Sequence, residues 1–155
     1  KALKNFSGVQ RRLTKVFKKD KVEFYDDYAH HPTEIKSVLE AIKKVTLKRK
    51  IITIFQPHRF TRIRTLKSEF IKCFKNTDQL ILCPVYAAGE PIDKNYNQVK
   101  FAKLISKFSK TQVIIASNEL DVTKYLRNNL INDEVVVGMG AGSISQWMYN
   151  LKNNL

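Results

Sequence analysis

Short apolar runs alternate with segments of helical periodicity from Val22 to the end of the chain. The apolar runs are mostly continuous, as expected for strands that are covered on both faces. Strands that alternate with helices are typical of parallel sheets built from βαβ units. The pattern therefore predicts an α/β fold with a mainly parallel sheet of five to six strands. The predicted strands are 22–26, 51–55, 79–83, 113–116 and 135–137.

Five helices are predicted between and after these strands, at 32–42, 63–74, 99–108, 119–130 and 144–151. The first begins with Pro32, a position where the missing N–H costs nothing, and its apolar residues recur on one face. The apolar and aromatic stripes of the helices are expected to face the core rather than a ligand. Residues 1–19 show no strand pattern and are interpreted as a linker with a preceding turn, so that the α/β domain spans 20–155.

Composition limits the class of protein. At 155 residues with 43% hydrophobic content, the chain has the size of one ordinary domain. No apolar run approaches the ~20 residues that cross a bilayer, and the first residues lack the apolar stretch of a secretory signal, so a soluble, cytoplasmic protein with no membrane partner is expected. Cys73 and Cys83 form no CxxC pair, which predicts reduced structural thiols. Because the chain begins with Lys1 rather than methionine, we expect a fragment of a longer protein.

The formal net charge of +14 raises the question of nucleic acid. The lysines are spread over every predicted helix and loop and are interrupted by acids, whereas a nucleic-acid arm usually carries a dense block of charge. Solvated lysine faces therefore explain the charge better than a phosphate-binding track, and no specific nucleic-acid partner is expected. A basic surface still favours anionic small ligands.

All three histidines lie in two polar clusters, residues 26–34 and 56–62, and each cluster follows a predicted strand and opens a predicted helix. Such junctions line the ligand crevice of open α/β sheets, so we expect a binding or catalytic surface there. In the first cluster, Asp26-Asp27 and His30-His31 leave two interpretations open. They could hold a metal ion, although the spacing resembles no standard zinc site, or one carboxylate could bind a ribose hydroxyl or orient an imidazole.

In the second cluster, Arg59 and Arg62 are three residues apart at the start of a helix, and His58 adjoins them. Their guanidinium groups can converge on one carboxylate or phosphate. Salt bridges to neighbouring acids, or plain solvation, are the alternative. Arg64 lies elsewhere on the helix and is expected to be solvated.

Two further loops follow predicted strands. The loop 84–91 is interpreted mainly as a shaped turn, in which Glu90 is a candidate functional acid. Residues 138–143 end a strand and begin a helix, but no ribose-binding acid follows on a later strand, so the dinucleotide fingerprint is incomplete. A tight turn with an anion contact at the helix start is expected there. The chain contains no P-loop sequence.

Four of these stretches resemble the carboxy-terminal domain of the Mur ligases of peptidoglycan synthesis, in the family's order and approximate spacing. They are residues 26–35, 56–62, 85–90 and 140–142. Residues 6–12 resemble the end of the family's central ATPase domain, although Leu13 stands where phenylalanine is common. The resemblance implies a three-layer, Rossmann-like domain at 20–155, with the end of the central domain and a linker at 1–19. The parent would also carry an amino-terminal UDP-sugar domain and a P-loop ATPase.

The resemblance also implies chemistry. With ATP and Mg²⁺, the muramoyl carboxylate of UDP-N-acetylmuramate would be phosphorylated, and the amine of L-alanine would attack the acyl phosphate to form an amide. This chain would be inactive without the missing domains. The residues implied by motif position are Asp27, Arg11 and Arg12 for the nucleotide, His30 and His58 for catalysis, and Arg59 and Arg62 for the substrate.

Other functions stay open at this point. They are a basic α/β module that binds nucleic acid, a ligase for another amino acid or peptide, and a purely structural fragment. The order of the motifs favours the alanine ligase.

Overall fold

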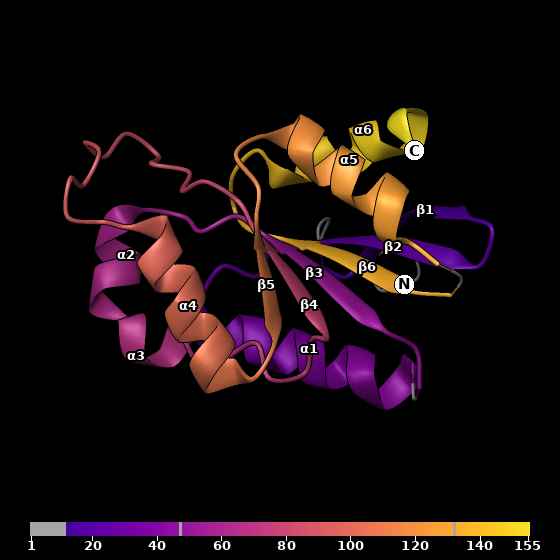
Figure 1. Ribbon diagram of the computed structural model, residues 1–155, viewed down its shortest axis with the longest axis horizontal. Helices are drawn as coiled ribbons and strands as arrows, with labels where there is room; N and C mark the ends of the chain where they lie inside the picture. The colour runs from indigo at the N-terminus through magenta and orange to yellow at the C-terminus, as the bar shows by residue number, and fades with distance from the viewer. Residues whose placement is uncertain (1–11, 47, 132) are drawn as a thin grey trace, which may run out of the picture.

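The computed structural model describes residues 12–46, 48–131 and 133–155, which form one six-stranded sheet with helices on both faces (Figure 1). The strands are β1 (Thr14–Lys19), β2 (Val22–Asp27), β3 (Ile51–Phe55), β4 (Gln79–Leu82), β5 (Gln112–Ile115) and β6 (Val135–Met139). The helices are α1 (Pro32–Thr46), α2 (Phe60–Thr65), α3 (Lys67–Phe70), α4 (Gln98–Ser109), α5 (Glu119–Asn129) and α6 (Ile144–Asn154). β1 is antiparallel to β2, and the other pairings are parallel. The predicted α/β class with a mainly parallel sheet is confirmed.

Two apolar cores lie on the two faces of the sheet. Figure 1 shows α5 and α6 over one face and α1 to α4 over the other. Alternate residues of each strand point to opposite faces, so that Ile51 and Phe55 of β3 join one core while Ile52 and Ile54 join the other. Every residue of β3 and β6 is buried, which explains why their sequences read as continuous apolar runs.

Strand β1 corrects the sequence-based interpretation of residues 1–19 as a linker without a strand. It lies at the edge of the sheet, and Phe17 stacks on Phe24 of β2 with ring centroids 4.1 Å apart. The pairing register shifts between Lys15 and Phe17, as at a β-bulge. Because a bulge interrupts the alternation of apolar and polar positions, the strand left no regular pattern in the sequence.

The second predicted helix, 63–74, is also different in the structure. It consists of the two short helices α2 and α3, separated at Leu66, whose φ of −108° departs from helical geometry. The residues after Phe70 form turns, yet Cys73 and Phe74 are buried as predicted. Burial of the stripe was therefore predicted correctly, and continuity of the helix was not.

The strand order β1-β2-β6-β3-β4-β5 places the functional loops together. Since β2, β6, β3 and β4 are parallel neighbours, their carboxyl ends lie at one edge of the sheet, which we call the carboxyl edge. The loops that carry the predicted site residues follow β2 and β3, and β6 lies between these two strands. The two polar clusters of the sequence therefore meet at the carboxyl edge.

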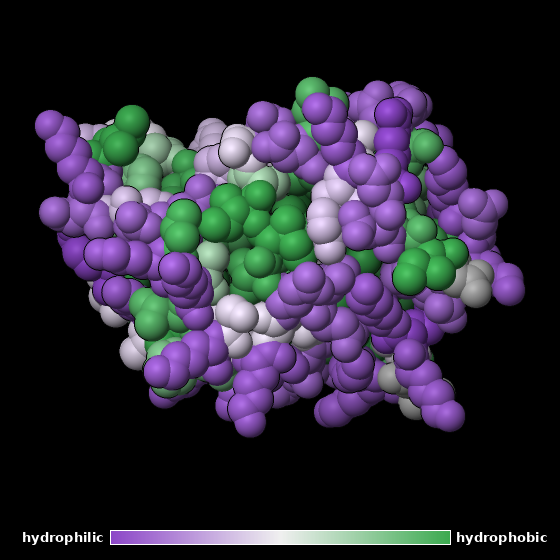
Figure 2. All heavy atoms as spheres, in the orientation of Figure 1, coloured by the Kyte–Doolittle hydropathy of each residue, from purple (hydrophilic) through white to green (hydrophobic). Residues whose placement is uncertain are grey.

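The opposite side of the sheet ends in β5, which pairs with β4 alone in the described part of the chain. Figure 2 shows an apolar area in the middle of this view, where Figure 1 shows β5 between α4 and α5, with hydrophilic residues around it. Ile115 of β5 is 40% exposed. No helix among the described residues has the length and apolar character needed to cross a membrane.

Candidate functional site

Asp27 ends strand β2 and is 5% exposed. Its Oδ1 accepts a hydrogen bond from the Ala29 N–H and its Oδ2 accepts one from the Leu13 N–H, each at 2.7 Å. Burial raises the pKa of this carboxyl, and the two hydrogen bonds partly offset the rise. A carboxylate can accept about four hydrogen bonds, so acceptor positions remain for a ligand hydroxyl.

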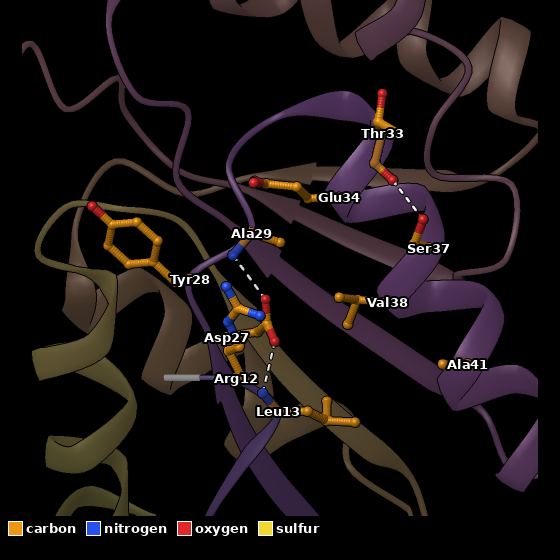
Figure 3. Close-up of a pocket in the computed structure, with 10 residues that line it drawn as sticks. All are labelled: Arg12, Leu13, Asp27, Tyr28, Ala29, Thr33, Glu34, Ser37, Val38 and Ala41. Atoms are coloured by element: carbon orange, nitrogen blue, oxygen red, sulfur yellow. Dashed lines mark hydrogen bonds between the residues drawn. The ribbon is translucent and has the colours of Figure 1, made fainter. Parts of the chain in front are cut away.

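A cavity of about 560 Å³, which we call the Asp27 cavity, opens beside this residue. Its volume is in the range of about 300–1,000 Å³ that is usual for small-molecule sites. Figure 3 shows one face of α1 along one side of this cavity and the start of β1 near Asp27. Arg12 is exposed and lines the cavity, whereas Arg11 lies outside the described residues. The lining residues are Arg12, Leu13, Asp27, Tyr28, Ala29, Thr33, Glu34, Ser37, Val38 and Ala41.

The acidic pair does not form one site. Asp26 is fully buried, and its Oδ2 accepts a hydrogen bond from Ser145 Oγ of α6 at 2.6 Å, while Asp27 faces the cavity beside α1. His31 Nδ1 accepts a hydrogen bond from the Thr33 N–H at 3.3 Å. Across the described ranges, no group of three or more His, Cys, Asp or Glu side chains could hold a metal ion. The structure therefore gives the metal hypothesis no support.

Three aromatic rings lie in a row at the carboxyl edge. His30 follows β2, His58 follows β3 and Tyr86 follows β4. The ring centroids of His30 and His58 are 5.7 Å apart, and those of His58 and Tyr86 are also 5.7 Å apart. We call these three residues and Arg62 the histidine cluster.

Arg62 lies in α2, and its side chain points back to His58, which precedes the helix. Its Nη1 donates to His58 Nδ1 at 3.0 Å and to the His58 carbonyl oxygen at 3.2 Å. The pKa of His58 is lowered, first by burial and then by the positive charges of Arg62, His30 and Arg59. The structure thus brings His30, His58 and Arg62 together. Convergence of Arg59 and Arg62 on one anion stays a prediction.

Arg59 stands in an unusual backbone conformation at the start of α2, with φ of 68° and ψ of 131°. Such a conformation costs about 1–3 kcal/mol for a residue other than glycine and occurs most often at functional sites. Two hydrogen bonds hold this segment, since the Arg59 N–H donates to the Tyr86 oxygen at 2.9 Å and the Tyr86 N–H donates to the Pro57 oxygen at 2.8 Å. The side chain of Arg59 is exposed at the carboxyl edge.

Glu90, a candidate acid in the sequence, supports the start of α2. Its carboxylate accepts hydrogen bonds from the Thr61 N–H at 3.1 Å and from the Thr61 hydroxyl. These bonds lower its pKa, and the charge of Arg59 adds to the effect. Arg59 occupies the N-cap position of α2 without a side-chain hydrogen bond, so a distant loop supplies the cap instead.

Gln56, for which the sequence suggested no role, is 4% exposed. Its Oε1 accepts from the Ile144 N–H at 3.0 Å, and its Nε2 donates to Ser143 Oγ at 3.0 Å. A Cβ added at Gly142 would lie 2.5 Å from Gln56 Oε1 and 2.5 Å from Tyr86 Cγ. The side chain of Gln56 therefore binds the start of α6, where the sequence had suggested a contact with an anion. The turn after β6 is packed closely against Gln56 and Tyr86. A buried polar residue directly after an apolar strand is the signal that could have identified it.

Fold and site together define the class of protein. It is an α/β domain of the Rossmann type, with a cavity of about 560 Å³ and a cluster of histidine and arginine side chains at the carboxyl edge of its parallel sheet. A family model described as "Mur ligase, glutamate ligase domain" matches residues 11–142. The chain belongs to the Mur ligase family.

Individual relatives agree with this assignment. The UDP-N-acetylmuramate–L-alanine ligase of Pelagibacter ubique is 46% identical over 151 residues, which are 97% of this chain and 32% of that protein. A crystal structure of the UDP-N-acetylmuramate-alanine ligase from Thermotoga maritima is 25% identical, with a TM-score of 0.76 over 98% of this chain and 31% of that chain.

A third match concerns a domain that was solved by itself. It comes from a Haemophilus ducreyi protein named as a UDP-N-acetylmuramate:L-alanyl-γ-D-glutamyl-diaminopimelate ligase, and it has the same fold, with a TM-score of 0.68 at 16% identity. It aligns over 92% of this chain and 98% of that domain. The present chain spans about a third of the length of the curated relatives that it matches.

Proposed function

We propose that this chain is the third domain of an ATP-dependent ligase that joins L-alanine to UDP-N-acetylmuramate in peptidoglycan synthesis. Relatives that are 36% and 46% identical over nearly the whole chain carry the name of that enzyme. In this proposal residues 1–13 belong to the end of a preceding domain and the linker, and the enzyme is cytoplasmic. The domain closes over the nucleotide and presents the amino acid.

The observation that carries the proposal is the position of the histidine cluster next to the Asp27 cavity. Glu34 connects the two, because it lines the cavity and its Oε2 accepts a hydrogen bond from the His30 N–H at 3.2 Å. A ligase of this class must hold a nucleotide and an amino acid at neighbouring places. Two adjoining sites of different character at one edge of the sheet meet that requirement.

The Asp27 cavity fits a nucleotide. The spare acceptor positions of Asp27 suit ribose hydroxyls, Arg12 or Arg11 suits the phosphates, and the apolar part of α1 suits a flat base. The described residues form no group of three or more His, Cys, Asp or Glu side chains that could hold a metal ion, and the sequence has no P-loop. In this proposal the domains outside this chain hold Mg²⁺ and the triphosphate. When bound, ATP supplies the phosphoryl group that activates the muramoyl carboxylate.

The histidine cluster, together with Arg59 beside it, fits the reacting groups. Arg59, with its exposed guanidinium, suits the carboxylate of L-alanine, and Arg62 adds positive charge from one turn further along α2. His30 and His58 would contact the amine and the activated acyl group. The domain would then act by positioning and by stabilising charge, as phosphoryl-transfer chemistry requires.

A domain exchange tests the proposal. The third domain of the Pelagibacter ubique ligase would be replaced with this chain, and ADP release would be measured with UDP-N-acetylmuramate and each amino acid in turn. We expect turnover with L-alanine from the hybrid and none from the 155-residue chain alone.

The Pelagibacter ligase without its third domain is the control for background activity. Ligation by the purified chain alone would contradict the assignment of ATP binding to other domains. A folded hybrid that prefers another amino acid or a peptide would identify a different member of the family.

A further inference from the structure

His30 and His58 are held by hydrogen-bond partners of opposite kind. His30 Nδ1 lies 2.9 Å from the carbonyl oxygen of Tyr28. A carbonyl oxygen can only accept a hydrogen bond, so Nδ1 of His30 must carry the hydrogen. In neutral His30 the other ring nitrogen, Nε2, is then an unprotonated acceptor.

At His58 the same ring nitrogen faces a donor. Its Nδ1 lies 3.0 Å from Nη1 of Arg62, and a guanidinium group has N–H donors and no acceptor. Nδ1 of His58 must therefore be unprotonated, and neutral His58 carries its hydrogen on Nε2. No hydrogen bond of the described residues engages His58 Nε2, which leaves that N–H for a ligand.

The charges around the two rings also favour protonation of His30 over protonation of His58. His58 faces Arg59 and Arg62 from its own helix segment, His30 from the loop after β2 and Glu90 from the loop after β4. A proton added to His58 would meet two arginines and break the bond to Arg62.

His30 faces His58 on one side and its own helix on the other. Oε2 of Glu34 lies 3.7 Å from Nδ1 of His30. A proton added at Nε2 of His30 would keep the bond to Tyr28 and gain this carboxylate as a partner.

We propose that His30 acts as a base and His58 as a hydrogen-bond donor, and that Arg62 is the positioning residue that fixes the tautomer of His58. His30 takes a proton at Nε2, and His58 donates a hydrogen bond from Nε2 to an oxygen that carries negative charge. On the proposed function, on which this step rests, the alanine nitrogen forms a bond to the acyl carbon, the bond from that carbon to the phosphate oxygen breaks, and phosphate leaves with the electron pair. His30 accepts the proton that the alanine amine gives up as the amide forms. The donor His58 then stabilises an oxygen of the activated acyl group.

The tautomers can be measured without any assumption about the reaction. The chain has three histidines, so ¹H–¹⁵N spectra of the imidazole groups are assigned with His30→Gln, His31→Gln and His58→Gln. We expect hydrogen on Nδ1 of His30 and on Nε2 of His58 at neutral pH. In Arg62→Met, His58 should become a mixture of tautomers and protonate at higher pH.

Arg64→Met is the matched control, because Arg64 is exposed and contacts Asp93 rather than a histidine. Its spectrum at His58 should equal that of the wild type. Hydrogen on Nδ1 of His58 in the wild type, or an unchanged His58 in Arg62→Met, would overturn the proposal.

Kinetics of the hybrid ligase test the two roles. A glutamine amide can donate a hydrogen bond but cannot act as a base. His58→Gln should therefore stay within about tenfold of the wild type, while His58→Leu loses on the order of 10²–10³ in kcat.

His30→Gln should lose on the order of 10²–10⁴ in kcat, together with the fall of activity at low pH that reports the base. Equal losses in His58→Gln and His58→Leu would overturn the donor role. A hybrid that makes no product while both tautomers are as expected would refute the proposed function and leave the tautomers standing.

Discussion

At the residue scale, the two arginines of the second cluster have different surroundings although their spacing suggested one shared anion. Arg62 donates to His58, whereas the side chain of Arg59 is exposed at the carboxyl edge. Spacing along a helix predicts which residues share a face, but it does not predict which neighbour a long side chain contacts. The different contacts of the two arginines became visible only with the structure.

Replacement of Arg59 in the hybrid ligase tests its assignment to the substrate carboxylate. Arg59→Ala should reduce alanine-dependent turnover by about 2–5 kcal/mol in transition-state stabilisation if a desolvated charge pair is lost. The melting temperature should not fall, because the Arg59 conformation is held by backbone bonds. Arg64→Ala should leave turnover almost unchanged, since Arg64 contacts Asp93 at the surface. Early melting with normal turnover in Arg59→Ala would make the arginine structural.

Asp27 has a structural role as well as its proposed role toward the nucleotide. In Asp27→Asn one of the two backbone donors, from Leu13 or Ala29, loses its acceptor, since the amide nitrogen can only donate. Urea unfolding should show a loss of about 1–3 kcal/mol, the usual cost of an unsatisfied buried donor. Asp20→Asn, an exposed turn residue, serves as the matched control and should be nearly neutral. An Asp27→Asn protein as stable as the wild type would show that the hydrogen bonds from Leu13 and Ala29 are not needed for stability.

At the element scale, most strands and helices were predictable because burial decides them. Continuous apolar runs identified β3 and β6, and the apolar stripe after Pro32 identified α1. Strand β1 escaped because its bulge breaks the alternation, and the break at Leu66 escaped because no glycine or proline marks it. The two features that the sequence did not predict, strand β1 and the break at Leu66, are those that the apolar pattern does not mark.

Strands β1 and β2 are joined by a charge network that makes stability depend on acid. Glu23 contacts Lys15 and Arg49, and its pKa is lowered from 4.5 to about 2, first by the hydrogen bond from Lys15. Since the folded-state pKa lies below the unfolded value, the stabilisation is complete above the unfolded pKa and is lost as pH falls toward about 2. Urea titrations at about pH 7 and about pH 3 should show a smaller acid loss in Glu23→Gln than in the wild type. Equal acid losses would remove Glu23 from the explanation.

The turn after β6 should tolerate no side chain at Gly142. A methyl group there would press on Gln56 and Tyr86, so Gly142→Ala should cost about 1–3 kcal/mol and disturb the stacking of Tyr86 on His58. Differential scanning calorimetry gives the loss, and the His58 imidazole signals report the site. Gly89→Asn is the control, because no atom lies within 4 Å of a Cβ at Gly89 and asparagine tolerates its φ of 85°.

At the scale of the whole molecule, the charge of +14 has no single centre that would direct a nucleic acid. The site residues identified from sequence are of both signs, since Asp27 is acidic whereas Arg59 and Arg62 are basic. The order of the strands, in contrast, could not be derived from any periodicity, and it alone decides which loops meet. The sequence predicted a mainly parallel sheet without an order of its strands, and that order became visible only in the structure.

Binding to duplex DNA provides the test of the charge argument. We expect weak, sequence-independent binding that disappears at about 200 mM salt, because dispersed lysines contribute counterion release only. Fluorescence anisotropy with two unrelated DNA sequences measures it. Binding that survives high salt and distinguishes the two sequences would favour the nucleic-acid hypothesis instead.

The insertion of β6 between β2 and β3 has a consequence for how the protein comes into being on the ribosome. The segments that carry His30 and His58 are synthesised before the strand that joins them, Val135–Met139. Contacts between distant parts of a sequence form slowly, because the loop between them must first close. Until the last strand arrives, the two histidines have no common framework. The candidate site therefore cannot assemble before β6 is made, and a nascent chain that stops short of β6 would have the residues of the site without their arrangement.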